Sequence, residues 1–254
     1  MNNSSWKAIF DRYKIQDHNF SDSPFLITAE QIKQATSHFS KTNEKEVRIL
    51  CKQDSREDRP QVFKDNELFI LPIKNGLYAI VKGEGYLDIP ELNNIQYIYR
   101  SKLDFSLDTS RIGNSEMQHL DFAYASSLVR TFLEDDTLVL TIRGRKYTPQ
   151  FSFFIGNQHL IVKSVQTEVD AGYEGKNQVV LIEAKNSLTN NVIIRQLFYP
   201  FRQWQHYTSK PVKTVFFEKR DKFYSLWQFE FNNIDNYNSV RLIKSARYEI
   251  NSRH

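Results

Sequence analysis

Cysteine is almost absent from this sequence, with Cys51 the only one among 254 residues. A single thiol cannot form an internal disulfide, and it cannot build a zinc site of several cysteines. The six histidines do not fall at close ligand spacing either. Because a lone, unpaired thiol fits a reducing compartment, we predict a cytoplasmic protein.

Glycine-rich and long apolar segments are also missing. The chain has only eight glycines and no low-complexity tract, which argues against disorder and against a repeat array. No apolar run reaches the roughly 18 residues of a membrane span, so we expect no membrane partner. The sequence has no glycine-rich phosphate loop, no Gly-x-Ser-x-Gly motif and no His-Glu-x-x-His motif. These three absences remove the usual signatures of P-loop nucleotide binding, serine hydrolysis and zinc proteolysis.

The remaining composition is that of a folded, mildly basic protein. Hydrophobic residues make up 40% of the chain and aromatic residues 14%, which is ample for a packed core. The formal net charge of +4 permits binding to a phosphate backbone without requiring it. A length of 254 residues suits one large domain or two modest ones.

The first 90 residues are expected to form an accessory α+β region. Apolar residues at helical spacing predict a first helix: Trp6, Ile9, Phe10 and Tyr13. Thr28 and Gln31 form a capping box that predicts the start of a second helix. Three runs rich in β-branched and aromatic residues are predicted strands: 47–51, 68–71 and 77–81. We assign residues 1–90 to this region and residues 91–254 to a second domain, with a connector at 91–114.

The second domain has a regular order of predicted elements. Ser115 and Gln118 form another capping box, at the start of a helix that runs to about residue 133. Apolar runs predict four strands: 137–142, 151–155, 159–170 and 178–185. A helix capped by Asn190 or Asn191 is expected next. Two more strands are expected to follow it: 212–218 and 223–231.

Charged residues stand at the ends of two of these predicted strands. Glu168 and Asp170 end the first, and Glu183, Ala184 and Lys185 follow the apolar run at the end of the second. Because side chains on a strand alternate between its faces, Glu183 and Lys185 share a face while Ala184 points away. Charges at the end of a buried strand are costly, so this arrangement favours a functional site over a structural one.

The spacing of the acids suits a shared metal ion. Asp170 and Glu183 lie thirteen positions apart, and a glycine-containing turn at 171–175 would place them on adjacent antiparallel strands. The alternative interpretation is a surface hairpin that carries a Glu/Lys pair.

This pattern resembles the PD-(D/E)xK nucleases. The resemblance covers the second domain, whose order of helix, three or four strands, helix and strand is the order of that family's core. It implies that Asp170, Glu183 and the main-chain carbonyl of Ala184 hold Mg²⁺. It also implies that Lys185 orients or helps to deprotonate the attacking water and stabilises charge on the phosphate. The family's proline is missing before Asp170, which leaves Glu168 as a rival or additional acid.

Other residues could complete such a site. Gln196 is a candidate catalytic residue, and with Gln203 and Tyr207 it resembles the glutamine and Gln-x-x-x-Tyr features of these nucleases. The polar face of an amphipathic helix explains the same residues equally well. Glu116 could be a further acid, or it could simply complement the dipole of the helix that it begins.

Basic residues supply candidate DNA contacts. Phosphate contacts are expected from a cluster at a predicted hairpin and from the helix that follows the motif: Arg143, Arg145, Lys146, Arg195 and Arg202. A solvated turn is the alternative for the cluster. Arg56 and Arg59 of the accessory region could read guanine edges in a major groove.

The sequence thus predicts a mixed α/β protein with a central sheet flanked by helices and an N-terminal α+β region. The resemblance implies a Mg²⁺-dependent endonuclease acting on double-stranded DNA, most similar to type II restriction enzymes. It would act as a homodimer on palindromic sites, because each active site cuts one strand. A repair or recombination nuclease and a DNA-binding protein without catalysis are the alternatives.

Overall fold

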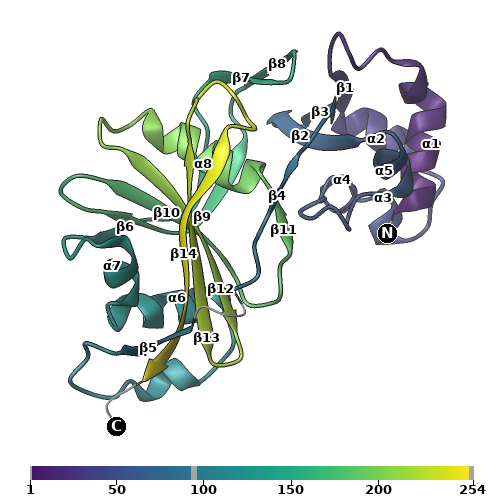
Figure 1. Ribbon diagram of the computed structural model, residues 1–254. Helices are drawn as coiled ribbons and strands as arrows, with labels where there is room; N and C mark the ends of the chain where they lie inside the picture. Colours follow the sequence, from purple (N-terminus) through teal and green to yellow (C-terminus); the bar gives the residue numbers. More distant parts are fainter. Residues whose placement is uncertain (1, 93–95, 252–254) are drawn as a thin grey trace.

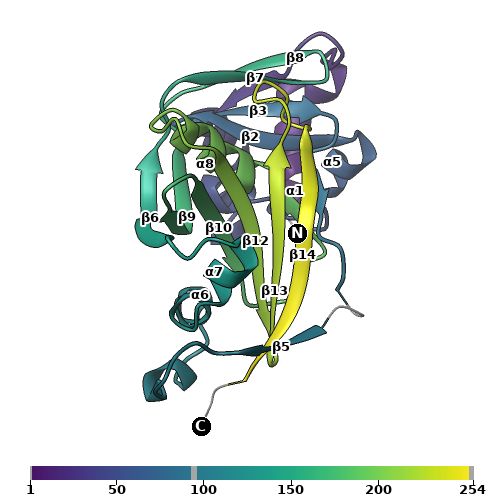
Figure 2. The same cartoon turned by 60° about the vertical axis from the view of Figure 1, so that its left-hand side comes forward.

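A seven-stranded mixed sheet forms the centre of the larger part of the molecule (Figure 1). The structure is a computed structural model, and it describes residues 2–92 and 96–251. The strands of this sheet are β5 (Gln96–Arg100), β6 (Val139–Tyr147), β9 (Gln166–Glu174), β10 (Val179–Lys185), β12 (Val212–Arg220), β13 (Phe223–Phe231) and β14 (Val240–Asn251). They lie in the order β5-β14-β13-β12-β10-β9-β6, and Figure 2 shows most of them side by side. The pairs β10–β12 and β14–β5 are parallel, and the other neighbours are antiparallel.

Helices cover both faces of this sheet. α6 (Glu116–Ala125) and α7 (Leu128–Leu133) pack on one face, and α8 (Arg195–Gln205) packs on the other. Side chains of β10 alternate accordingly, since Val180 belongs to the core beneath α6 and α7 and Leu181 to the core beneath α8. This mixed sheet with flanking helices confirms the predicted α/β class. No helix in the described ranges is long and apolar enough to cross a membrane.

The helix predicted to run from residue 116 to about 133 is two helices. Its start is as predicted, because the Ser115 side chain accepts a hydrogen bond of 3.1 Å from the main-chain N–H of Gln118. The break lies at Ser127, which has a φ of 66°. A left-handed backbone cannot continue a right-handed helix, so the chain turns there before α7 begins.

Several predicted boundaries in the second half are wrong. The predicted strand 159–170 is divided by Ser164, which has a φ of 55°, into β8 (Gln158–Val162) and β9. β8 pairs with β7 (Phe151–Ile155) in a separate hairpin. Asn191 does not cap a helix, since it begins β11 (Asn191–Ile193), which pairs with β4 (Tyr86–Asp88). β5 lies within the predicted connector, and β14 has no counterpart among the predicted elements.

The N-terminal unit combines helices with a small sheet. Its elements are α1 (Asn3–Tyr13), β1 (Phe25–Thr28), α2 (Ala29–Thr36), α3 (Thr42–Lys45), α4 (Val47–Leu50), α5 (Gln61–Asp65), β2 (Leu68–Lys74) and β3 (Leu77–Lys82). Short 3-10 helices lie at Ile15–Asp17 here and at Asp108–Arg111 in the second part. The predicted capping box is confirmed, because the Thr28 side chain accepts from the Gln31 N–H and the Gln31 side chain accepts from the Thr28 N–H. The three strands lie in the order β1-β3-β2.

The predicted strand 47–51 is instead the short helix α4. Val47 and Leu50, three residues apart, are both buried in the core of the N-terminal unit. This helical spacing turns both side chains inward beside Trp6, whose indole N–H donates a hydrogen bond of 3.0 Å to the Leu50 carbonyl. Burial against α1 therefore overrides the β-propensity of a short run.

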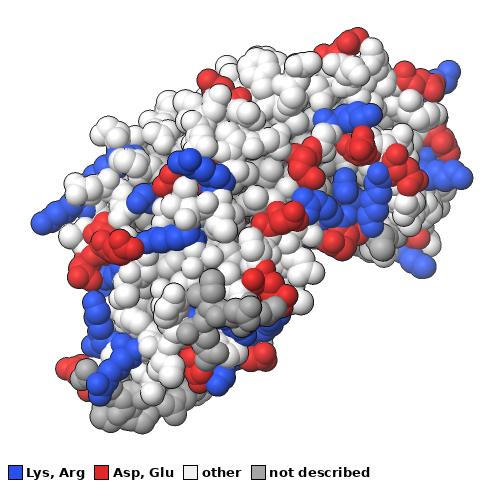
Figure 3. Space-filling model, viewed as in Figure 1, with Lys and Arg blue, Asp and Glu red and all other residues white. Residues whose placement is uncertain are grey.

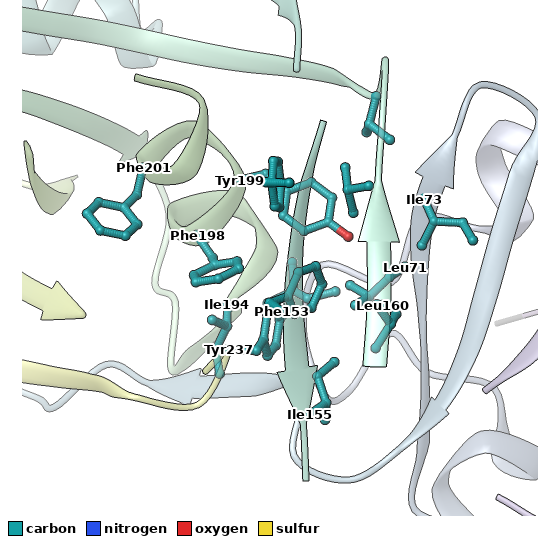
Figure 4. Packing of buried hydrophobic residues seen from close by; sticks show 14 of the residues in the cluster. Leu71, Ile73, Phe153, Ile155, Leu160, Ile194, Phe198, Tyr199, Phe201 and Tyr237 are labelled. Carbon is teal, nitrogen blue, oxygen red and sulfur yellow. The ribbon is translucent and has the colours of Figure 1, made fainter. Parts of the chain in front are cut away.

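The two parts of the chain share a hydrophobic core through β2. Leu68 and Ile70 pack in the N-terminal core, whereas Leu71 on the opposite face packs against β7, β8 and α8. Figure 4 shows this packing, with Leu71 beside Leu160 of β8 and the aromatic rings of α8 further in. β2 is thus buried on both faces, which explains its unbroken apolar sequence.

Candidate active site

The end of the β9–β10 ladder brings two carboxylates to the same place. The ladder pairs Ala171 with Ile182, so the next residues along the two strands are Asp170 and Glu183. The turn between the strands lies at residues 175–178 instead of 171–175, which means that Asp170 lies within β9 and not at its end. The predicted antiparallel neighbourhood of the two strands is confirmed.

A local irregularity in β9 directs the Asp170 side chain. The β6–β9 ladder shifts register between Ile142 and Gly144, opposite Asp170. As a result Val169 packs beneath α8 while Ala171 packs beneath α6 and α7, although a regular strand would turn both to one face. Bulges of this kind re-aim side chains next to functional sites.

The Asp170 carboxylate accepts the hydrogen bond that the Ala184 N–H would otherwise donate to a main-chain carbonyl of β9. Its Oδ2 accepts a hydrogen bond of 2.7 Å from the Ala184 N–H, beyond the last ladder pair. The N–H and C=O of one strand residue point to the same edge, so the Ala184 carbonyl also points towards β9. Two carboxylates and a carbonyl therefore gather at this edge of β10.

Glu183 and Lys185 form a partly buried ion pair on the face of β10 that carries α8. Lys185 Nζ lies 2.5 Å from Glu183 Oε1, and the two side chains are 24% and 12% exposed. The shared face is the one expected from strand alternation. Both groups have lost most of their water, so each depends on the other for its charge.

Burial shifts the protonation of all three groups. It raises the pKa of Glu183 to about 7, although the neighbouring Lys185 charge works against this. Burial also raises the pKa of Asp170, against the hydrogen bond from Ala184. For Lys185, burial lowers the pKa, but the Glu183 carboxylate outweighs it and the net shift is upward. The amine is therefore protonated at neutral pH, while Glu183 is close to its titration midpoint.

The donor set matches the preference of a hard cation. In the described part of the chain, no three Asp, Glu, His or Cys side chains are placed to hold a metal together. The oxygens at the β9–β10 edge are two carboxylates, Asp170 and Glu183, and one carbonyl, Ala184. Mg²⁺ binds through one or two carboxylates and keeps several waters, so this set suits it without a third acid.

A small, open hollow lies beside Glu183 and is partly lined by α8. Gln196 lines it, and its Oε1 is buried without a hydrogen-bond partner. A buried, unpaired amide oxygen is costly unless a ligand or water completes it. Glu168 lines the same hollow but pairs with Arg145, whose Nε lies 3.1 Å from its carboxylate. Gln196 is thus placed to bind a ligand or water in the hollow, and Glu168 lies at the outer rim of the hollow.

The basic cluster predicted at a hairpin lies within strand β6. Arg143 donates a hydrogen bond of 3.1 Å to the Asp170 carbonyl and pairs with Asp121 of α6. It therefore supports the backbone of the catalytic candidate. Arg145 and Lys146 are both exposed to solvent on this edge strand of the sheet. The Lys146 ammonium also lies 5.7 Å from the centroid of the Trp204 ring.

Two residues of α8 serve the fold. Arg202 donates to the Ser152 and Ile234 carbonyls, which ties α8 to β7 and to the loop after β13. Gln203 is 1% exposed and bonds Thr167 and the Tyr147 carbonyl, whereas Tyr207 is exposed.

The two arginines expected to read bases, Arg56 and Arg59, have partners within the chain. Arg56 pairs with Asp88 and lies 3.4 Å from Glu84. Arg59 donates 3.2 Å to the Leu68 carbonyl. Ion pairs thus hold Arg56, and main-chain carbonyls hold Arg59.

Two acids near the site were not among the main sequence candidates. Asp54 lies in the loop after α4, pairs with Arg195 at 3.6 Å, and its charge raises the pKa of Glu183. Nothing in the local sequence marks it, because it arrives from the N-terminal unit. Glu116, which had the helix dipole as an alternative explanation, is close enough for its charge to raise the pKa of Lys185.

Comparison with known proteins places both parts of the chain in described families. Residues 3–80 match the family described as "Domain of unknown function (DUF6996)". Residues 81–249 match "Domain of unknown function (DUF6997)", which covers more than half of the chain. No curated protein and no solved structure matches this chain. The chain therefore belongs to the DUF6997 family, and its N-terminal unit matches DUF6996.

Proposed function

We propose that this protein is a Mg²⁺-dependent nuclease of the PD-(D/E)xK kind that hydrolyses phosphodiester bonds in double-stranded DNA. The observation that carries the proposal is the hydrogen bond from the Ala184 N–H to Asp170, next to the Glu183–Lys185 pair. It joins the two acids and the carbonyl that the resemblance requires.

The order of elements supports the proposal independently of these residues. A helical segment, α6–α7, is followed by β6, β9 and β10, which form one antiparallel meander. α8 then connects β10 to β12, which is parallel to β10. This is helix, three strands, helix and strand, with the β7–β8 hairpin inserted between β6 and β9.

The residues divide the work by their chemistry. Asp170, Glu183 and the Ala184 carbonyl would hold the cation, and Gln196 would orient a ligand or water in the hollow. Mg²⁺, when bound, would polarise the phosphate and lower the pKa of water. The protonated amine of Lys185, whose pKa the Glu183 carboxylate raises, would supply positive charge to the phosphate.

A type II restriction enzyme working as a homodimer is the specific form that we propose. One β9–β10 site cuts one strand, so two copies are needed to cut a duplex. A repair or recombination nuclease would use the same site on branched DNA. Digestion of supercoiled plasmid with Mg²⁺, and with EDTA as the control, separates these outcomes. Discrete fragments support restriction, preference for a four-way junction supports repair, and intact plasmid and junction with Mg²⁺ would contradict the nuclease.

Cation binding should depend on pH through Glu183. Its pKa of about 7 means that protons compete with Mg²⁺ below neutrality. We expect Mg²⁺ affinity, measured by calorimetry, to fall about tenfold per pH unit below pH 7 and to level off above it. Glu183→Gln, which does not titrate, should bind Mg²⁺ weakly at every pH. An affinity that is flat between about pH 6 and pH 8 in the natural protein would contradict this assignment.

A further inference from the structure

The N-terminal unit has the element order of a winged helix–turn–helix domain. α1 is followed by β1 and α2, then by the α3–α4 segment and the additional short helix α5, and the unit ends in the β2–β3 hairpin. β1 adds to this hairpin beside β3, which gives the sheet order β1-β3-β2. In helix–turn–helix proteins the second helix of the pair enters the major groove of DNA. By position its counterpart is the α3–α4 segment, which residues 37–41 join to α2 and which consists of two short helices separated by the extended residue Glu46.

The exposed side of the α3–α4 segment is basic on balance, because four cations outnumber the two acids Glu44 and Glu46. Four cations recur at intervals of four, three and four residues, and all are exposed: Lys41, Lys45, Arg48 and Lys52. Of these, only Lys52 has an acidic partner within 4 Å among the described residues, namely Asp54 at 3.7 Å. Figure 3 shows Lys and Arg side chains gathered over this part of the unit, with Asp and Glu beside them. The three exposed cations without such a partner, Lys41, Lys45 and Arg48, suit a phosphate backbone.

The same segment carries groups that can contact bases. Asn43 is exposed, and an asparagine amide can bond the edge of adenine. Ile49 is 38% exposed, although it belongs to a helix whose other apolar residues are buried. An exposed aliphatic side chain between cations can contact a thymine methyl group.

The basic segment leads directly to the candidate active site. The chain leaves α4 and reaches Asp54, whose carbonyl accepts a hydrogen bond of 2.9 Å from the Ile193 N–H. The Asp54 carboxylate pairs with Arg195, the neighbour of Gln196 in the hollow. In Figure 1, α4 lies on the side of the N-terminal unit that faces β4 and β11, while α1 lies on the outer flank. A single bound molecule could therefore contact both places.

We infer that the α3–α4 segment is the DNA-recognition element of this protein. It lies in the major groove of a duplex whose phosphate backbone reaches the Asp170–Glu183 site. Lys41, Lys45 and Arg48 contact phosphates or guanine edges, and Asn43 contacts a base. The inference takes duplex DNA as the substrate from the proposed nuclease function, but the binding that it describes needs no cleavage.

Binding by the full-length protein tests this inference. The probe is a fluorescein-labelled duplex of about 30 base pairs, roughly three helical turns, measured by anisotropy in EDTA so that no cleavage occurs. Lys45→Glu/Arg48→Glu should weaken binding at least about tenfold and reduce the salt slope by about two. The matched control is Lys7→Glu/Lys14→Glu, which makes the same charge change at two exposed positions, one in α1 and one directly after it, and should stay within about twofold.

The outcomes separate the recognition element from the nuclease. Equal effects of both variants, no effect of either, or tighter binding to double-stranded RNA would overturn the inference. Circular dichroism verifies the fold, and Lys41→Ala/Lys52→Ala replaces the first variant if that one unfolds. If only the first variant loses DNA binding and the natural protein does not cleave plasmid, the recognition element is supported and the nuclease function is contradicted. Mg²⁺-dependent cleavage that neither variant affects would support the nuclease and overturn the recognition element.

Discussion

Asp170→Asn is expected to abolish Mg²⁺-dependent cleavage while the protein remains folded. Asparagine keeps the size of the side chain, and its carbonyl oxygen can still accept the hydrogen bond from the Ala184 N–H. What it removes is the negative charge that would hold the cation. A metal ion contributes several kcal/mol to transition-state stabilisation, so we expect a rate loss of about a thousandfold or more in a plasmid assay.

Glu168→Gln provides the matched control for this prediction. Glu168 lies two residues from Asp170 in β9 and lines the hollow beside Glu183, but its carboxylate pairs with Arg145 at an exposed position. We expect its loss to change the cleavage rate less than about tenfold, since the charge it contributes is screened by solvent. If Glu168→Gln were inactive and Asp170→Asn active, the acid that holds the cation would be Glu168 and not Asp170.

Lys185→Ala should also abolish cleavage, for a different reason. The substitution removes the ammonium that would stabilise the phosphate and leaves the Glu183 carboxylate buried without its partner. DNA binding in EDTA should change little, because most of the basic residues proposed for binding lie elsewhere. Normal cleavage by this variant would remove Lys185 from the site.

Phe198→Ala is expected to have the largest effect on stability. Phe198 is fully buried, and its ring lies 5.1 Å from Phe153, 5.0 Å from Phe231 and 5.3 Å from Tyr237, measured between centroids. Removing a fully buried phenylalanine costs about 3–5 kcal/mol, through lost transfer energy and the cavity left behind. Chemical denaturation should therefore show a large drop in the free energy of unfolding.

The same variant tests whether the two parts of the chain fold together. Phe198 belongs to the core that also contains Leu71 of the N-terminal unit. A shared core predicts one cooperative transition that moves as a whole to lower denaturant. Phe105→Ala, at a ring that is 58% exposed, should cost less than about 0.5 kcal/mol. Two separate transitions, only one of them shifted, would show that the parts unfold independently.

Local sequence signals predicted the elements whose residues determine their own conformation. The Thr28 capping box depends on two side chains three residues apart, and the predicted strands 68–71 and 77–81 became β2 and β3, two strands joined by a short turn. The neighbourhood of β9 and β10 followed from apolar runs on either side of a short turn. In each case the interacting groups are close in sequence, so the pattern contains the information.

The features that sequence could not predict depend on distant contacts. α4 is helical because Val47 and Leu50 pack in a core that α1 completes. The register shift opposite Asp170 arises between β6 and β9, which are separated by the β7–β8 hairpin. Asp54 reaches the site only because β11 binds the loop that carries it. Single-strand patterns contain none of these long-range pairings.

Anomalous diffraction from crystals soaked in Mn²⁺ tests the central claim most directly. Mn²⁺ takes the same oxygen ligands as Mg²⁺ and scatters strongly enough to be located. We predict one strong peak within coordination distance of the Asp170 and Glu183 carboxylates, and its loss in Asp170→Asn. A map with no peak at the β9–β10 edge, from crystals whose Mn²⁺ binds elsewhere or not at all, would contradict the account.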